Sequence, residues 1–232
     1  MSSYFSSQYS RINDINLNDK EGISNWYLKN LESYSYEFSN LKIDFENKII
    51  LEIGCGIGGF LYYLNHKGIS NFLGIDIDEK QISVCKQFVT PKVICKDVFE
   101  FLDETNEKFD VIVMFDVIEH IKKDNIIPLL KEINNILNKN GLLVLRTPNM
   151  ASMTSFYSRY LDFTHEIGFT SESLEYVLNE TNFKNISFSN SAIGRKRIFV
   201  TKLITKFIFN LLRFPAPKIF TSNILAVAKK IK

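Results

Sequence analysis

An apolar run that ends in a cluster of glycines constrains this chain more than any other feature. Residues 50–60 read ILEIGCGIGGF, so one acid, Glu52, is followed by four glycines within six positions. A buried strand that breaks into glycines and then turns into a helix presents backbone N–H groups with no side chains in the way. This pattern favours a turn that binds a nucleotide-like ligand.

Apolar runs and helical patterns alternate from residue 48 onward. The sequence predicts strands at 48–53, 71–77, 92–96, 109–115, 142–147, 183–189 and 223–229, and helices at 57–66, 79–88, 125–137 and 170–180. Because parallel strands are joined by crossover helices, this alternation predicts an α/β domain built on a mostly parallel sheet.

A further helical pattern at 24–45 precedes this alternation. We therefore divide the chain into an N-terminal helical segment, residues 1–47, and a main domain, residues 48–232. The helix of the first segment is expected either to pack on the main domain or to form a lid over its site.

Charge is distributed unevenly along the chain. Residues 181–232 contain 11 of the 28 Lys and Arg residues and no acid, which leaves a net charge of −9 on residues 1–180. Most of this basic segment is an amphipathic insertion at about 194–220, between the last two predicted strands. We consider three roles for it: packing on the domain, docking on an anionic membrane surface through residues 195–214, or binding a partner protein. Its basic residues stand among large aliphatic side chains, so we expect no nucleic-acid partner.

The remaining composition bears on the cellular location. The three cysteines are odd in number and show no CxxC spacing, which argues against a disulfide framework. The N-terminus has no apolar signal-peptide core, and no run of about 18 uncharged apolar residues occurs. We therefore expect a cytoplasmic protein, with a peripheral position on the inner face of the membrane as a further hypothesis.

Acids at the strand ends indicate which nucleotide-like ligand is bound. Asp76 ends the second strand, where a carboxylate accepts hydrogen bonds from both hydroxyls of a ribose. Asp97 ends the third strand, where it can accept from an adenine amine while Val98 flanks the ring. Helix capping is the alternative role for both. Glu52 suits a ligand that carries a cationic amine and a sulfonium, which favours S-adenosylmethionine over NAD.

Five motifs carry a resemblance to a known family. They are ILEIGCGIGGF, LGIDID, CKDVF, FDVIVMFDVIEHI and NGLLVLRTPN, and in this order and spacing they resemble class I S-adenosylmethionine-dependent methyltransferases over residues 45–190. The stretch TPNMASMTSFYSRYLDFTHEIGFTSESL is similar to a subgroup of small-molecule O-methyltransferases that act in quinone biosynthesis and in bacterial surface-sugar modification.

This resemblance implies a fold and a set of cofactor contacts. The implied fold is a Rossmann-like, seven-stranded sheet of order 3-2-1-4-5-7-6, with strand 7 antiparallel and helices on both faces. The implied cofactor-binding residues are Glu52, Gly54, Cys55, Gly56, Asp76, Ile77, Asp97, Val98, Phe115 and Asp116.

Two histidines are candidates for the chemistry of transfer. His120 follows the fourth strand, and His165 lies in a long loop after the fifth strand, so both belong to the edge where such sheets bind ligands. We predict that His165 is a general base or orients the acceptor, with a structural role in fixing the loop as the alternative. Asp162 could fix the tautomer of His165 or could be a solvated acid of the loop. His120 is a second candidate base, with a cofactor contact or a structural role as alternatives. His165, Asp162, Glu166 and Glu119 form no recognisable metal-ligand spacing, so no metal is expected.

The predicted function is S-adenosylmethionine-dependent methyl transfer to a small-molecule acceptor. We expect a hydroxyl of a glycan or sugar intermediate, with a polyprenyl quinone precursor as the alternative, and either could be lipid-linked. Two rival hypotheses remain open: an NAD(P)-dependent oxidoreductase, and a non-catalytic cofactor-binding partner or membrane-associated subunit.

Overall fold

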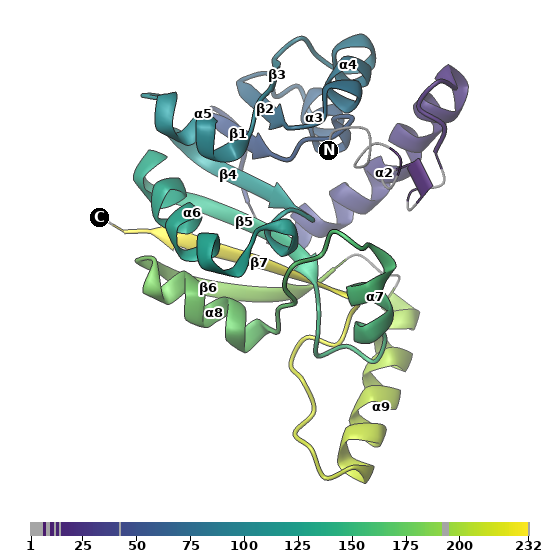
Figure 1. Ribbon diagram of the computed structural model, residues 1–232. Helices are drawn as coiled ribbons and strands as arrows, with labels where there is room; N and C mark the ends of the chain where they lie inside the picture. Colours follow the sequence, from purple (N-terminus) through teal and green to yellow (C-terminus); the bar gives the residue numbers. More distant parts are fainter. Residues whose placement is uncertain are drawn as a thin grey trace.

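The computed structural model describes residues 7, 10, 11, 13, 15–41, 43–191 and 195–231. In this part of the chain a seven-stranded sheet has the order β3-β2-β1-β4-β5-β7-β6 (Figure 1). Its strands are β1 (Ile50–Ile53), β2 (Phe72–Asp76), β3 (Val93–Cys95), β4 (Phe109–Phe115), β5 (Leu137–Pro148), β6 (Phe183–Asn190) and β7 (Asn223–Lys230). Neighbours among β1 to β5 pair in parallel, whereas β7 runs antiparallel to β5 and β6. The predicted strand order is confirmed.

Helices cover both faces of the sheet, as predicted. The hydrophobic core on one face includes residues of α5 (Val98–Glu104), α6 (Lys123–Ile136) and α8 (Ser171–Glu180). The core on the other face includes residues of α2 (Lys20–Leu41), α3 (Gly59–His66) and α4 (Glu79–Phe88). The elements α7 (Ser155–Leu161), α9 (Arg195–Leu211) and the 3-10 helix η1 (Ile118–His120) complete the described fold.

The central strand β4 is apolar at every position from residue 111 to 115, and its cover on both faces explains this run. Ile112 and Met114 belong to the core on one face, whereas Val111, Val113 and Phe115 belong to the core on the other. Successive side chains of a strand point to opposite faces, so a strand that is covered on both sides must be apolar at every position. This burial fixes the position of the loops that follow its carboxyl end.

Several element boundaries differ from the predicted ones. The strand predicted at 142–147 begins earlier, because β5 includes Asn140–Gly141, where Asn140 has φ of 64° and the register against β4 shifts. The helices α5 and α7 were not predicted. Each has only seven residues, which is too short for a clear hydrophobic period.

Helix α2 packs on the main domain through aromatic side chains. Tyr34 and Phe38 lie in a cluster with Phe60 of α3 and Phe115 of β4, with ring centroids 5.1 to 6.0 Å apart between the helix and these two rings. Near its start, Trp26 covers Gly59, where an added Cβ would lie only 2.9 Å from the indole ring. The N-terminal helix therefore sits directly over the glycine-rich segment. Its action as a lid stays a prediction.

Candidate active site

The glycine-rich segment forms a turn that only glycine adopts readily. Gly54, Gly56 and Gly58 have φ of 73°, 55° and 87°, in the left-handed region that side chains disfavour. The N–H groups of Gly54 and Cys55 both donate to the Ile75 carbonyl, at 2.8 and 2.9 Å. The turn is thus fixed against the end of β2, before α3 begins.

The side chain of Asp76, at the end of β2, also holds this turn. Its Oδ2 accepts from the Gly56 N–H and its Oδ1 from the Asp78 N–H, both at 2.8 Å. Burial raises the pKa of Asp76 to about 6, although the backbone hydrogen bonds act in the opposite direction. Asp78 caps α4 by accepting from the N–H groups of Lys80 and Gln81. Asp76 is therefore not the helix cap, and its predicted ribose contact remains open.

Asp97 caps a helix, which was its alternative role. Its side chain accepts from the Phe99 N–H at 2.8 Å, at the start of α5. Val98 is buried beside it, whereas Ile77 is 48% exposed after β2. A contact from Asp97 to an adenine amine is compatible with this cap, because a carboxylate has about four lone-pair positions. The contact itself stays a prediction.

Glu52 is the unusual acid of the site. Its side chain is only 3% exposed, and its Oε2 accepts no hydrogen bond from any described residue. Burial raises its pKa well above the ordinary value, while the nearby Arg146 acts to lower the pKa. Buried carboxyl oxygens almost always have a partner. A ligand with a positively charged donor would supply one here.

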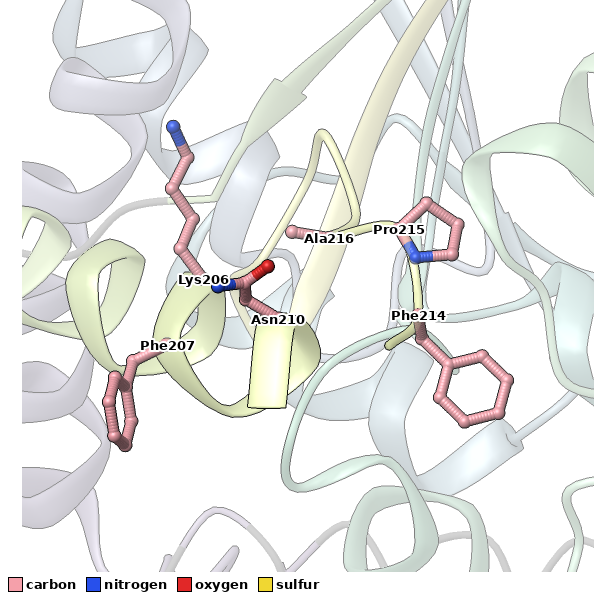
Figure 2. Close-up of a pocket in the computed structure, with 6 residues that line it drawn as sticks. All are labelled: Lys206, Phe207, Asn210, Phe214, Pro215 and Ala216. Atoms are coloured by element: carbon pink, nitrogen blue, oxygen red, sulfur yellow. The ribbon is translucent and has the colours of Figure 1, made fainter. Parts of the chain in front are cut away.

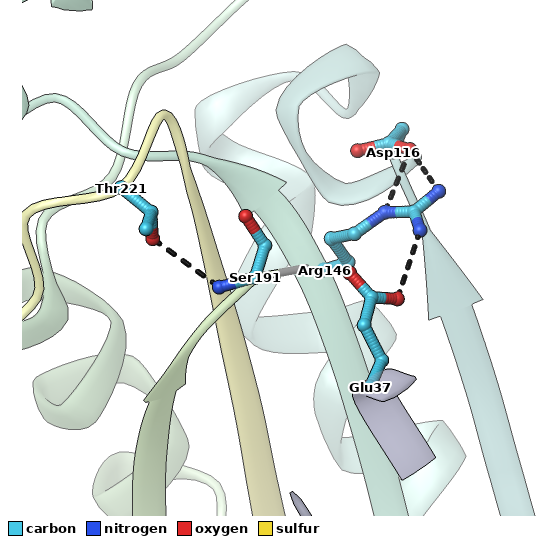
Figure 3. Close-up of polar contacts among 5 residues, drawn as sticks. All are labelled: Glu37, Asp116, Arg146, Ser191 and Thr221. Carbon is cyan, nitrogen blue, oxygen red and sulfur yellow. Dashed lines mark hydrogen bonds and ion pairs between the residues drawn. The ribbon is translucent and has the colours of Figure 1, made fainter. Parts of the chain in front are cut away.

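Arg146, which was not among the predicted site residues, joins three elements at the carboxyl edge of the sheet. Arg146 of β5 donates to Asp116 Oδ2 from Nε at 3.0 Å and from Nη2 at 2.6 Å, and its Nη1 lies 3.3 Å from Glu37 Oε2 of α2 (Figure 3). Its guanidinium carbon is 4.6 Å from the centroid of the Phe115 ring. The ion pairs connect α2 to the ends of β4 and β5. A charged residue inside the apolar run LLVLRT was the available signal.

Two of the predicted cofactor-binding residues direct their side chains into the core. Cys55 and Phe115 are both buried, and both belong to the cluster beneath α2 and α3. Any contact that these two positions make with a cofactor at the sheet edge would therefore use their main-chain atoms.

The two candidate histidines lie next to each other. The ring centroids of His120 and His165 are 4.8 Å apart. Thr164 connects His120 to Asp162: its hydroxyl lies 2.8 Å from His120 Nδ1 and donates to Asp162 Oδ1 at 2.6 Å. The predicted partner of His165 is different, because His165 Nδ1 lies 3.3 Å from the Arg159 carbonyl oxygen. Asp162 thus orients His120 through Thr164.

Ionisation of this group follows from its burial and contacts. Burial and the neighbouring His165 lower the pKa of His120, which keeps its imidazole neutral. Burial acts to raise the pKa of Asp162, but the hydrogen bonds from Thr164 and the nearby imidazoles outweigh it and hold that pKa below its usual value. A neutral imidazole beside an ionised carboxylate can accept a proton.

Glu119 lies next to the two histidines. Its side chain is 1% exposed, its Oε2 accepts from the Thr147 hydroxyl at 3.0 Å, and its Oε1 accepts no hydrogen bond from any described residue. Its carbonyl oxygen accepts from the N–H groups of Glu166 and Ile167, at 2.8 and 3.2 Å, which ties the loop of His165 to η1. One ligand atom each of Glu119, His120 and His165 lies within 4.8 Å of the others.

The sheet order and the glycine turn define a Rossmann-like domain with a site at the carboxyl ends of its parallel strands. A family model described as a methyltransferase domain matches residues 29–188, more than half of the chain. The chain therefore belongs to this methyltransferase family. The resemblance to class I S-adenosylmethionine-dependent methyltransferases is confirmed.

Curated relatives match only part of their own length. An uncharacterized protein of Rickettsia prowazekii is 34% identical over 104 residues, and the ubiquinone biosynthesis O-methyltransferase of Bartonella quintana is 31% identical over 109 residues. These alignments cover 42% and 45% of this chain, and 41% and 43% of the two relatives. The chain thus spans less than half the length of these relatives.

Solved structures share the fold at low identity. An S-adenosylmethionine-dependent methyltransferase from Archaeoglobus fulgidus is 22% identical, with a TM-score of 0.67, and the match covers 86% of this chain and 94% of that one. The plantazolicin methyltransferase BpumL, solved in complex with SAH, is 19% identical with a TM-score of 0.62, over 100% and 93% of the two chains. Both likenesses concern the fold.

Proposed function

We propose that this chain transfers a methyl group from S-adenosylmethionine to a hydroxyl of a small-molecule acceptor, a sugar or glycan intermediate. The observation that best supports S-adenosylmethionine as the cofactor concerns Glu52. This residue is buried beside the glycine turn, and one of its carboxyl oxygens has no hydrogen-bond partner among the described residues. A cationic, hydrogen-bond-donating group stabilises such a carboxylate, whereas the pyrophosphate of NAD(P) would be repelled.

The chain's own residues would align the reactants. The cofactor supplies an electrophilic methyl group: its sulfur–methyl bond breaks with the electron pair left on sulfur, while the acceptor oxygen bonds to the methyl and loses its proton. Positioning of this kind lowers the barrier by about 7–11 kcal/mol. The glycine turn and Asp76 are proposed to hold the cofactor. His165 and His120, at the ends of the neighbouring strands, are proposed to orient the acceptor hydroxyl or receive its proton.

A thermal-shift series tests the cofactor. Saturation at 100 times the dissociation constant stabilises a protein by about 2.7 kcal/mol, which corresponds to roughly 5–11 °C for a chain of this size. We expect S-adenosylmethionine and S-adenosylhomocysteine to raise the melting temperature, and the shift to shrink in Glu52→Gln. The matched control is Glu175→Gln, an exposed glutamate of α8. A shift with NAD or NADP alone would refute the proposal.

A transfer assay then tests the acceptor. The chain is incubated with methyl-labelled S-adenosylmethionine and either sugar and glycan acceptors or hydroquinones with a polyprenyl chain. The name of the Bartonella quintana relative keeps the quinone precursor as the second candidate acceptor. Label in the hydroquinone fraction only would exclude the sugar, and cofactor binding without transfer to either class would favour a non-catalytic partner.

We propose further that the acceptor is lipid-linked and that the chain docks on an anionic membrane surface. The apolar side chains Val200, Leu203, Ile204, Phe207 and Leu211 of α9 recur at helical spacing, and all are exposed. Figure 1 shows that α9 extends away from the sheet. Before and within the loop of His165, Phe156, Tyr160 and Phe163 are also exposed, Phe163 to 88%. A monomeric protein in water rarely exposes apolar groups in this way.

The positive charge of this surface favours the binding of anionic lipid headgroups over the binding of a partner protein. Lys202 and Lys206 are exposed on the side of α9 opposite the apolar stripe, Arg213 is exposed just after the helix, and no acid occurs in residues 181–232. A depression of about 530 Å³ adjoins it, lined by Lys206, Phe207, Asn210, Phe214, Pro215 and Ala216 (Figure 2). In the described residues no helix is long and apolar enough to cross a bilayer. Basic residues flanking an exposed apolar helix face are typical of interfacial binding.

Vesicle sedimentation tests this docking. We expect the chain to pellet with phosphatidylglycerol vesicles more than with phosphatidylcholine vesicles, and Phe207→Asp to reduce the pelleted fraction. Tyr176→Asp is the matched control, because Tyr176 of α8 is 65% exposed and Phe207 is 70% exposed. If the chain stays in the supernatant but is a dimer that Phe207→Asp dissociates, the surface binds a second copy and the membrane proposal is wrong.

A further inference from the structure

We propose that Glu119, His120 and His165 form a binding site for a divalent transition-metal cation that holds the acceptor hydroxyl. The three residues offer ligand atoms within 4.8 Å of one another, from η1 and from the loop after α7. Two imidazoles with one carboxylate are a donor set used by zinc, iron, cobalt and manganese, whereas magnesium and calcium prefer oxygen ligands. The role of the metal rests on the proposed methyl transfer, but its binding does not.

Glu119 provides the strongest indication of a missing ligand. It is 1% exposed, and Thr147 fixes one carboxyl oxygen, while Oε1 accepts no hydrogen bond from any described residue. A buried carboxyl oxygen without a hydrogen-bond partner is destabilising, and a bound cation would supply the missing partner. The Thr147 contact also orients the carboxyl group, as the second shell of a metal site does.

Hydrogen bonds define the tautomers of both imidazoles. The Thr164 hydroxyl donates to Asp162, so towards His120 it acts as an acceptor and His120 Nδ1 carries the proton. The Arg159 carbonyl can only accept, so His165 Nδ1 carries its proton as well. In the neutral form of each ring the lone pair therefore lies on Nε2, the form in which histidine binds metals.

The backbone holds the three ligands together without any metal. The N–H groups of Glu166 and Ile167 donate to the Glu119 carbonyl, so the loop next to His165 is tied to η1. Ligand–metal distances of about 2.0–2.2 Å require the side chains to approach by up to roughly 1 Å. Rotation of the two half-buried imidazoles about their side-chain bonds would supply such a shift without movement of the sheet.

A cation at this place would act on the acceptor. Three protein ligands leave coordination positions open, and a hydroxyl bound there loses its proton to solvent more readily because the metal lowers its pKa. The resulting oxygen then forms its bond to the methyl group as the sulfur–methyl bond breaks. His165 and His120 would therefore serve as metal ligands, with Asp162 and Thr164 as positioning residues.

Cobalt(II) titration tests the site directly. The probe is CoCl₂ added to tag-free, chelator-treated protein, in a Cys95→Ser background because Cys95 is an exposed free thiol. We expect a saturable visible absorption band at one cobalt per chain, lost in Glu119→Gln and in His165→Asn. His66→Asn, a change at an exposed histidine of α3, is the matched control and should leave the band unchanged. Thr164→Val should weaken binding about 10–100-fold.

The outcomes separate this inference from the proposed function. Absence of one-to-one cobalt binding, or a band that persists in both ligand variants, would overturn the metal site. Far-UV circular dichroism checks folding, and if Glu119→Gln unfolds, the comparison of His165→Asn with His66→Asn decides. The S-adenosylmethionine thermal shift is measured on the same samples. A shift without cobalt binding leaves the methyltransferase proposal standing, whereas cobalt binding without a shift refutes that proposal alone.

Discussion

Cofactor affinity should fall as the pH is lowered, because Asp76 is partly protonated in the free chain. Its pKa is raised to about 6 from the ordinary value of 3.8, chiefly by burial. Ribose hydroxyls that donate to Asp76 favour the charged carboxylate and lower this pKa in the complex. The free chain then holds a proton that the complex does not, so binding releases protons and tightens as the pH rises from about 4 to 6.

The size of the effect follows from these two values. If the complex returns Asp76 to a pKa of 3.8, the free chain is about nine-tenths protonated at pH 5 and about one-tenth protonated at pH 7. The dissociation constant should therefore be about tenfold larger at pH 5 than at pH 7 from this group alone, which is about 1.4 kcal/mol. Glu52, whose pKa is also raised by burial, adds to the same trend.

Isothermal titration calorimetry at pH 5, 6 and 7 measures both the affinity and the released protons, when each pH is run in two buffers of different ionisation enthalpy. In Asp76→Asn the ratio of the dissociation constants at pH 5 and pH 7 should be about tenfold smaller than in the wild type. Asp103→Asn, at an exposed acid of α5, should keep the wild-type ratio. Equal ratios in wild type and Asp76→Asn would refute the contact between Asp76 and the cofactor.

Three further changes probe other parts of the site. Gly58→Ala should lower the unfolding free energy by about 1–2 kcal/mol because of its φ of 87°, and by about 1–3 kcal/mol more because the added Cβ would press against α4. Gly68→Ala is the control, since Gly68 has φ of 76° but open space around it, so urea unfolding should show only the first loss. His165→Ala should lower kcat by about 10²–10⁴-fold, with the dissociation constant of S-adenosylmethionine unchanged in calorimetry. Arg146→Met removes the guanidinium that forms ion pairs with both Asp116 and Glu37, and should lower the unfolding free energy by about 3–5 kcal/mol; a loss under 1 kcal/mol would contradict that estimate.

The features that the sequence predicted well are those with a local physical signal. The run FDVIVMF matches β4 residue for residue, because burial on both faces demands apolar side chains at residues 111–115. The glycine turn was predictable because positive φ angles favour glycine. The start of the helix predicted at 170–180 is correct to within one residue, and there the Thr170 hydroxyl accepts from the Ser173 N–H and caps α8. Each of these three features depends on residues that are close together in the sequence.

Features that depend on the pairing of distant segments were not predicted. Arg146 was read only as part of an apolar strand, and its ion pair with Glu37 joins residues that are 109 positions apart. The exposed face of α9 was also undetermined, since a helical apolar stripe has the same period whether it meets the core or water. Burial decides between these cases, and burial is a property of the fold.

The cluster of Glu119, His120 and His165 could have been predicted from the order of the strands, although no sequence motif indicates it. Linear spacing gave no metal motif, because the loop residue lies 45 positions beyond the pair in η1. Yet β4 and β5 are parallel neighbours with Phe115 opposite Arg146, so the segments after both strands must begin side by side. Any histidines and acids in those two segments are therefore candidates for one site, whatever their separation along the chain. The same reasoning places Asp116 and Arg146 together, and there the ion pair is present.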